Sequence, residues 1–338
     1  MTYDNIEQFD GYTISRRVLP KADPRLGRTI VHDSRNRGFA IAEADAATLV
    51  STFHKRRIGS LNQLQVGACT GNATVGNLGT DPIVSTVPAG TVLDENLALR
   101  VYSDAEVIDG DGPYPPNDNG SSGPSAAKAA KNLGLCSGYT HAFSLLAAQT
   151  ALQSRPVMFG TEWTQDMFTP GPDGYVHPTG AVAGGHEYEV AAVDFEAGCF
   201  VCINSWGNWG VADARVDATT GVFYISFADA GTLLAAEGDV TQLVPLAVPA
   251  PTPVPPTPTP APVPPTPTPA PVPPAPSGGG ASFPGSSPEV DAHLAARAAR
   301  KGLSDAPAYE AWFWDRVLHL TGGDPDVEIS VSTIDLLL

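Results

Sequence analysis

The chain has 338 residues, of which 42% are hydrophobic, enough for about two domains with a sizeable core. Its formal net charge of -17 argues against nucleic acid or an anionic membrane surface as the main partner. No run of about 18 apolar residues occurs, so we expect no membrane insertion. Four cysteines are too few for a disulfide framework. These features indicate a soluble, acidic chain and are compatible with an enzyme.

The N-terminal part differs in charge from the rest. Residues 1–60 contain ten Lys/Arg and seven Asp/Glu, although the whole chain is strongly acidic. The first ten residues are polar and lack an apolar segment, so we expect no signal peptide and a cytoplasmic or virion-associated location. We interpret residues 1–58 as a basic leader that docks onto the acidic body. A cleavable inhibitory leader is the alternative.

The body, residues 59–246, is expected to contain helices first and strands later. Ser122, Pro124 and Gly134 predict a capped helix between them, and a second helix is predicted over 140–153. Segments rich in β-branched and aromatic residues predict strands at 157–160, 188–195, 199–203 and 221–227. Helices followed by strands indicate an α+β fold with an antiparallel sheet.

The C-terminal part begins with a segment dominated by proline. Sixteen of the 33 prolines lie between residues 249 and 276, where the nonapeptide TPTPAPVPP occurs twice in tandem. Proline fixes φ and lacks a backbone donor, so we interpret 247–285 as a Pro/Thr-rich linker, either a semi-rigid spacer or a ligand for proline-binding domains. Residues 286–338 then form a small acidic module with helices at 288–301 and about 307–320. Its aromatic cluster around Trp312 either forms a small core or docks an unknown protein partner.

Three short segments carry residue types used in nucleophilic catalysis. Segment 62–73 contains Gln63 and Cys69, 184–188 contains His186, and 203–210 contains Asn204. A thiol becomes a strong nucleophile as the thiolate, which a neighbouring histidine stabilises while a third group orients the imidazole ring. His186 follows Cys69 by 117 residues and Asn204 follows it by 135. The order, spacing and flanking residues together are stronger evidence than any one residue.

This set resembles the papain family of cysteine peptidases. The stretch Val66-Gly67-Ala68-Cys69-Thr70 matches the family's Cys-Gly-Ser/Ala-Cys-Trp/Tyr signature at the glycine, the alanine and the nucleophile. Asn204-Ser205-Trp206-Gly207 matches its Asn-Ser-Trp-Gly signature in full, and segments 116–122 and 160–168 look like cleft-bordering loops of bacterial and phage members. The resemblance covers about 60–230 and implies a two-domain papain-like fold: a helical left domain, an antiparallel β right domain and an active-site cleft between them. Val66 and Thr70 depart from the signature.

The resemblance implies a role for each matching residue. Cys69, at the start of a helix, is the expected nucleophile, His186 the base and Asn204 the group that orients the ring. Gln63 is expected to stabilise the oxyanion, and Trp206 to shield the histidine–asparagine hydrogen bond. The expected substrate-binding residues are Gly67, Trp163, Gly185 and Trp206, although Trp163 and Phe168 fill the groove between domains in the alternative interpretation.

Other residues of these types have simpler interpretations. Cys136, Cys199 and Cys202 are expected to be small buried hydrophobic residues, and the Cys199–Cys202 pair is disfavoured as a zinc site because it lacks a second pair. His141 and His177 compete with His186 as the base. Glu187 is expected to be solvated or to pair with a local ion. No metal and no cofactor are implied.

The predicted function is hydrolysis of peptide bonds in a protein or peptide substrate by a cysteine-type endopeptidase, through a thioester at Cys69. One alternative is a virion or cell-surface structural protein whose peptidase body serves as a binding module. The other is the same chemistry directed at the peptides of peptidoglycan.

Overall fold

The computed structural model describes residues 5–9 and 11–247. The helices are α1 (Cys69–Leu78), α2 (Glu95–Asp109), α3 (Gly123–Asn132), α4 (Leu145–Ala151) and α5 (Phe227–Ala235), with short 3-10 helices at Ser34–Phe39, Ala46–Thr48, Ile83–Thr86, Gln165–Phe168 and Ala214–Val216. The strands are β1 (Asn5–Phe9), β2 (Tyr12–Arg17), β3 (Ile30–Asp33), β4 (Thr52–Phe53), β5 (Gly138–Ala142), β6 (Val157–Thr164), β7 (Val182–Asp194), β8 (Cys199–Ile203), β9 (Val211–Asp213), β10 (Ala218–Ser226) and β11 (Asp239–Val244).

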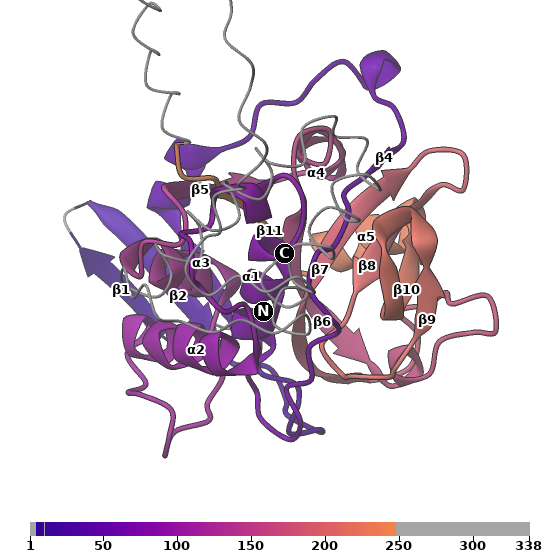
Figure 1. Cartoon of the computed structure of the whole chain (residues 1–338). Helices are drawn as coiled ribbons and strands as arrows, with labels where there is room; N and C mark the ends of the chain where they lie inside the picture. Colours follow the sequence, from indigo (N-terminus) through magenta and orange to yellow (C-terminus); the bar gives the residue numbers. More distant parts are fainter. Residues whose placement is uncertain (1–4, 10, 248–338) are drawn as a thin grey trace, which may run out of the picture. The chain divides into compact units, whose positions relative to one another are not determined.

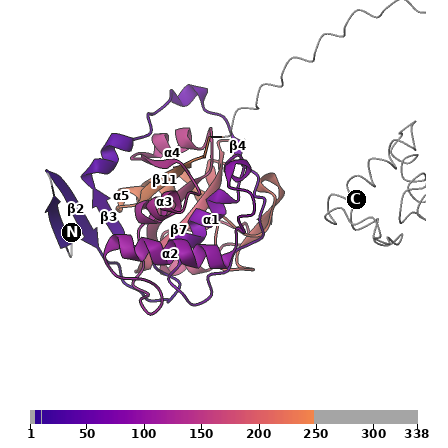
Figure 2. The ribbon, with the colours of Figure 1, turned by 60° about the vertical axis from the view of Figure 1, so that its left-hand side comes forward.

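The strands form two antiparallel sheets. The larger has the order β5-β11-β6-β7-β8-β10-β9, with β4 also paired to β7, and the smaller has the order β1-β2-β3. Helices α1, α2 and α3 lie together on one side of the central strands, and β8, β9 and β10 lie on the other (Figure 1). Figure 2 shows the small sheet at the edge of this body, apart from the central strands. The fold is α+β with an antiparallel main sheet, as the sequence predicts.

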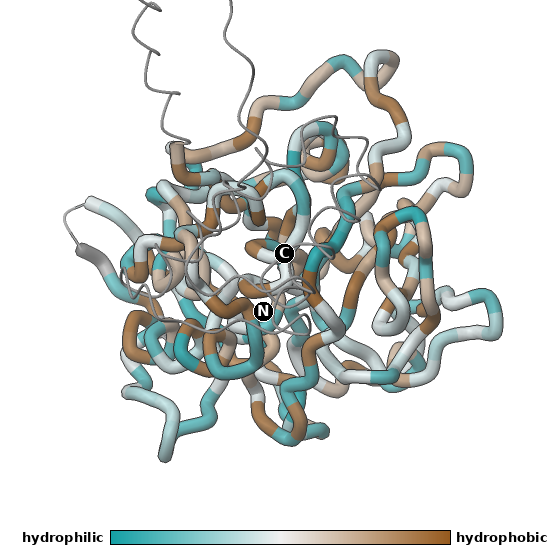
Figure 3. Tube along the Cα trace, in the orientation of Figure 1, coloured by the Kyte–Doolittle hydropathy of each residue, from teal (hydrophilic) through white to brown (hydrophobic). Residues whose placement is uncertain are grey.

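Two hydrophobic clusters support the two halves. One joins α1, α2 and α3 to β6 and β11, and the other joins α4 and α5 to β6, β7, β8 and β10. In α2 the buried residues Ala98, Val101, Tyr102 and Ala105 recur at helical spacing, and Figure 3 shows hydrophobic residues alternating with hydrophilic ones along this helix. Helix α1 is buried along its whole length, so its first residue is held firmly between the halves.

The predicted elements differ from the observed ones mainly at their ends. The helix at Ser122 is confirmed, with the Ser122 side chain accepting the Ser125 N–H as an N-cap. The predicted helix 140–153 is wrong at its start, because 138–142 pairs with β11, about 100 residues away, and only α4 is helical. Strand β7 begins at Val182, six residues before the predicted start, and α2 was not predicted.

The N-terminal part contacts the body through charged side chains. Arg16 pairs with Asp111, and Arg17 pairs with Glu162 and Glu237. The predicted linker and both predicted tail helices lie outside the described residues. Among the helices of the described ranges, none combines the length and apolar character needed to cross a bilayer.

Candidate active site

Cys69 is the first residue of α1, as the sequence predicts. Its N-cap, Ala68, provides no side-chain hydrogen bond, so the free N–H groups and the positive end of the helix dipole face the region around Cys69. The backbone N–H groups of Glu187 in β7 and of Gly27 approach the sulfur. The side chain of Cys69 has no exposed surface. The thiol therefore lies at the junction of α1, β7 and the N-terminal segment.

His186 lies inside β7, opposite Thr161 of β6. Its Nε2 lies 2.9 Å from Oδ1 of Asn204, and because an amide oxygen only accepts, Nε2 carries the hydrogen. The other ring nitrogen, Nδ1, is buried and has no hydrogen-bond partner among the described residues. The N–H of the next residue, Glu187, approaches the sulfur of Cys69, so β7 passes beside the thiol. Nδ1 is the ring nitrogen that the hydrogen bond to Asn204 leaves unused.

Asn204 and two tryptophans hold the imidazole ring in place. The Asn204 N–H donates to the carbonyl of Gly221 over 2.8 Å, which fixes the residue just after β8. The ring centroids of Trp206 and Trp163 lie 4.8 Å and 4.9 Å from that of His186. Trp206 therefore shields the histidine–asparagine hydrogen bond. Trp163 has no exposed surface and belongs to the hydrophobic core behind the ring, so in this conformation it fills space rather than lining a substrate site.

Gln63 is held rigidly, with its amide group directed at two carbonyls. Its Oε1 accepts a 2.7 Å hydrogen bond from the Ser205 hydroxyl. Its Nε2 donates to the carbonyls of Val66, at 2.7 Å, and Arg25, at 2.9 Å. The amide that the sequence assigns to an oxyanion is thus already bonded to a peptide carbonyl of the same chain.

That carbonyl belongs to a segment that covers the site, residues 19–29, which we call the covering segment. It forms backbone hydrogen bonds to β7, from Ala22 to Ala183 over 2.9 Å and from Arg28 to Gly185 over 3.0 Å. On its other side Gly27 accepts from the N–H of Ser121 over 2.8 Å. The covering segment is therefore clamped between β7 and the loop before α3, over Cys69.

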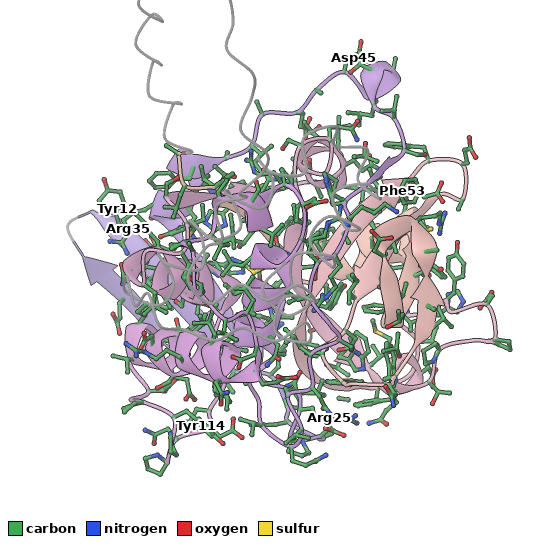
Figure 4. The ribbon with its side chains drawn as sticks, in the orientation of Figure 1. Tyr12, Arg25, Arg35, Asp45, Phe53 and Tyr114 are labelled. Carbon is green, nitrogen blue, oxygen red and sulfur yellow. The ribbon has the colours of Figure 1, made fainter. Side chains whose placement is uncertain are left out.

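Close backbone contacts leave little room between the covering segment and the site. A Cβ on Gly27 would lie 1.8 Å from the carbonyl oxygen of Gly67, and one on Gly185 would lie 2.2 Å from that of Arg28. The guanidinium of Arg25 lies 4.1 Å from the ring centroid of Trp206. Figure 4 labels Arg25 near the bottom of the view. Gly67, Gly185 and Trp206, all expected to bind substrate, thus contact the covering segment instead.

The electrostatics of the covered site favour a neutral pair. Burial raises the pKa of Cys69 to about 12, against hydrogen bonds from the Glu187 and Gly27 N–H groups. Burial lowers the pKa of His186 to about 4, although the hydrogen bond to Asn204 opposes this shift. Both shifts disfavour the charged forms of the two groups while the covering segment is in place.

Glu187 corrects one expectation and reveals residues that the sequence analysis missed. It is not solvated but fully buried, and its charged neighbours are Asp239 and Arg28. Arg28 donates to Asp239, 211 residues away, over 2.6 Å. Glu187, Arg28 and Asp239 are far apart in the sequence, so no local spacing predicts that they meet. The one sequence feature that pointed to this cluster is the acidic residue directly after His186.

The competing residues lie elsewhere. His141 is on β5, three strands from β7 in the sheet order, and bonds Thr241, while His177 pairs with Asp229 at the surface. Cys136, Cys199 and Cys202 are buried free thiols. Within residues 5–9 and 11–247, no group of three or more His, Cys, Asp or Glu side chains could hold a metal ion.

Comparison with known proteins identifies structures with a similar fold. No family model matches the chain, and no curated protein matches it. Xylellain, a cysteine protease from Xylella fastidiosa, has a similar structure, with a TM-score of 0.51 and 15% identity over 68% of this chain and 98% of that one. The digestive procathepsin L 3 of Tenebrio molitor aligns with a TM-score of 0.44 and 12% identity, over 66% of this chain and 77% of that one. The chain has a papain-like fold.

Proposed function

We propose that this protein is a cysteine peptidase that hydrolyses peptide bonds through Cys69, His186 and Asn204. The observation that carries the proposal is the hydrogen bond from Gln63 to the carbonyl of Arg25, beside a buried thiol and an oriented imidazole. The covering segment thus presents a peptide carbonyl to the amide that we assign to the oxyanion. A peptidase explains a carbonyl donor beside a buried thiol and an oriented imidazole better than an inert binding module does.

The geometry supports a sequence of acyl transfers. Nδ1 of His186 takes the proton of Cys69, whose sulfur attacks the substrate carbonyl carbon. The oxygen gains negative charge and is stabilised by the Gln63 amide and the N–H at the start of α1. His186 then gives the proton to the leaving amine, which departs and leaves a thioester on Cys69. Water, deprotonated by His186, hydrolyses the thioester and restores the thiol.

The contacts of the covering segment support a closed, inactive state of this enzyme. The segment fills the site with backbone hydrogen bonds on both sides and excludes water from Cys69 and His186. We therefore favour the inhibitory alternative for this part of the leader, 1–58, over simple docking. Its release would expose the thiol and reduce the burial that raises the pKa of Cys69 and lowers that of His186.

Replacing Gln63 with alanine is expected to lower kcat about 100-fold with little change in KM, because the lost donor acts mainly on the developing oxyanion. The measurement is the steady-state hydrolysis of a fluorogenic peptide. Gln63→Glu is the matched control: it keeps the shape but removes the donor, so it should lose as much activity. A variant that raises KM alone would contradict the assignment.

Acid is expected to release the covering segment. The closed state keeps His186 neutral down to about pH 4, whereas an uncovered histidine takes up a proton near its ordinary pKa of 6.5. The equilibrium constant for release of the covering segment therefore rises as the pH falls below 6.5. It should be about tenfold larger at pH 5.5 than at pH 8. Asp23 and Arg25, whose charges act on His186 in opposite directions, both belong to the covering segment. The measurement is amide hydrogen exchange of residues 22–29, corrected for intrinsic rates, in the Cys69→Ala chain. Protection that stays constant or rises on acidification would contradict this mechanism.

One experiment tests the proposed function directly. Purified full-length protein is incubated at pH 5 with a fluorogenic peptide while its termini are mapped by mass. Peptide hydrolysis that appears together with loss of the covering segment supports a self-processing peptidase. Parallel assays on casein and on cell-wall material distinguish a protein substrate from peptidoglycan peptides. No hydrolysis in any assay would leave the binding-module alternative.

A further inference from the structure

A cavity of about 360 Å³ lies between the small sheet and the body, and its lining includes none of Cys69, His186 and Asn204. One wall consists of residues of β2, β3 and the 3-10 helix at Ser34–Phe39. The other wall consists of residues of β5, β11 and the segments next to them. Ligand pockets in proteins typically measure about 300–1,000 Å³. The cavity is therefore large enough for a small molecule.

The covering segment is the connection between the two strands that form the first wall. It runs from the end of β2 to the start of β3, and these ends pair at Arg17 and Ile30. Thr13 and Ser15 of β2 and His32 of β3 line the cavity. A molecule that contacts both walls binds best while the small sheet stays on the body. Such a molecule stabilises the closed state by mass action.

His141 brings a buried hydrogen-bonding atom without a partner to the cavity. The residue is 3% exposed and belongs to the lining. Its Nδ1 lies 3.2 Å from the Thr241 hydroxyl oxygen, whereas Nε2 is buried and has no hydrogen-bond partner within the described part of the chain. Burial lowers the pKa of His141 and so favours the neutral ring. In the tautomer in which Thr241 donates to Nδ1, Nε2 carries the hydrogen and is a donor.

Arg37, on the opposite wall, is a cation that forms no ion pair with the residues that the structure describes. Its guanidinium lies 5.8 Å from the ring centroid of Phe143, and that ring lies 6.2 Å from the ring of His141. Leu234 and Val240 add further apolar surface to the lining. The Phe143 ring thus lies between two hydrogen-bond donors and continues an apolar surface.

The acidic residues of the lining already have partners. Asp33 pairs with Arg35, and Asp239 pairs with Arg28. A carboxylate ligand has a single negative charge and accepts hydrogen bonds from a guanidinium through both oxygens. A phosphate group has a charge of about -1.5 to -2 at neutral pH, so the two nearby carboxylates would repel it more strongly. The cavity therefore favours a carboxylate over a phosphate.

We propose that this cavity binds a small monocarboxylate with an apolar body, and that the bound ligand holds the covering segment over Cys69. The carboxylate accepts from Arg37 and from Nε2 of His141, and the apolar body packs on Phe143. The effect on activity rests on the proposed function, whereas binding and retention of the segment do not. Two sources have this chemistry: the C-terminus of a short peptide, which a peptidase releases, and a free aliphatic acid.

The first test compares N-acetyl-leucine, which has the carboxylate and the apolar body, with its amide, which lacks the charge. Binding is measured by titration calorimetry on the full-length Cys69→Ala chain at pH 7, where no processing occurs. The acid should bind at least about tenfold more tightly, because the amide cannot form the charge-assisted hydrogen bonds. Arg37→Gln should weaken binding of the acid about tenfold. Arg100→Gln, which removes an exposed guanidinium on α2, is the matched control and should leave the affinity unchanged.

The second test measures amide hydrogen exchange of residues 22–29 in the same chain. N-acetyl-leucine at ten times its Kd should slow this exchange about tenfold, because release of the segment then requires loss of the ligand. The Arg37→Gln chain should show a much smaller effect at the same concentration. 4-Methylpentanoate, which lacks the acetamido group, distinguishes the two sources. Weaker binding than that of N-acetyl-leucine indicates a peptide C-terminus, and equal or tighter binding indicates a free acid.

The outcomes separate this inference from the proposed function. No binding of the acid, equal binding of acid and amide, or an affinity unchanged in the Arg37→Gln chain overturns the carboxylate site. Binding that leaves the exchange of residues 22–29 unchanged overturns the link to the covering segment. None of these measurements depends on hydrolysis, so a chain that binds the acid but cleaves no peptide refutes the peptidase alone.

Discussion

Replacing Cys69 with alanine is expected to reduce peptide hydrolysis by about 10⁶-fold while leaving the fold intact. The nucleophile and its base act together, so removing the nucleophile abolishes nearly all of the rate enhancement from covalent catalysis. The residual rate comes from substrate binding and the oxyanion donors alone. The same variant should keep its N-terminal segment during incubation at pH 5, because self-processing needs the thiol. Hydrolysis of a fluorogenic peptide and mass mapping of the termini measure both effects.

Cys136→Ala is the matched control for this variant. Cys136 is also a buried free thiol, but it packs in the helical half, against residues of α1, α2 and α3. Its replacement should leave hydrolysis and processing unchanged, and circular dichroism should show the same fold for both variants. Wild-type activity in the Cys69→Ala protein, or an equal loss in the Cys136→Ala protein, would refute the role of Cys69.

Replacing Arg56 with alanine is expected to lower the free energy of unfolding by about 3–5 kcal/mol. Arg56 and Glu189 form an ion pair whose side chains are 3% and 1% exposed, and Thr80 donates a second hydrogen bond to Glu189. Burial raises the pKa of Glu189, and the Arg56 charge opposes that shift. Without Arg56 the carboxyl group is left buried and uncompensated. Urea denaturation followed by fluorescence gives the change.

The neighbouring residue supplies a matched control. Arg57 pairs with Asp81 and Asp217, but its side chain is 48% exposed, and such surface pairs contribute little to stability because water screens the charges. Arg57→Ala should therefore shift the urea midpoint only slightly. Similar losses in the two variants would show that burial of the Arg56–Glu189 pair does not control stability. A large loss in Arg56→Ala alone would place residue 56 in the folded body, although its basic character suggested a leader.

Much of the candidate site can be predicted from the sequence because its residues lie in short local motifs. Cys69 was expected at the start of a helix from the residues around it, and α1 begins there. The residues next to His186 and Asn204 predict a histidine and asparagine of one site, and in the fold Nε2 of His186 lies 2.9 Å from Oδ1 of Asn204. The antiparallel sheet was likewise expected, because strand composition and turns are local properties. The bounds were less accurate, as in β5, where pairing with β11 overrides a helical prediction.

Other properties depend on residues that meet only after folding. The basic charge of residues 1–60 is evident in the sequence, but nothing in it shows that Arg25 and Arg28 lie across the catalytic groups. The solvated position expected for Glu187 was wrong because Arg28 and Asp239, far away along the chain, enclose it in the fold. Residue types and local patterns are sufficient to predict the candidate reactive groups and the class of fold, because reactivity and strand or helix preference belong to single residues and their neighbours. Only the folded chain shows that the thiol is buried under residues 19–29 and that Glu187 lies beside Arg28 and Asp239, because burial and charge pairing depend on distances that sequence separation does not set.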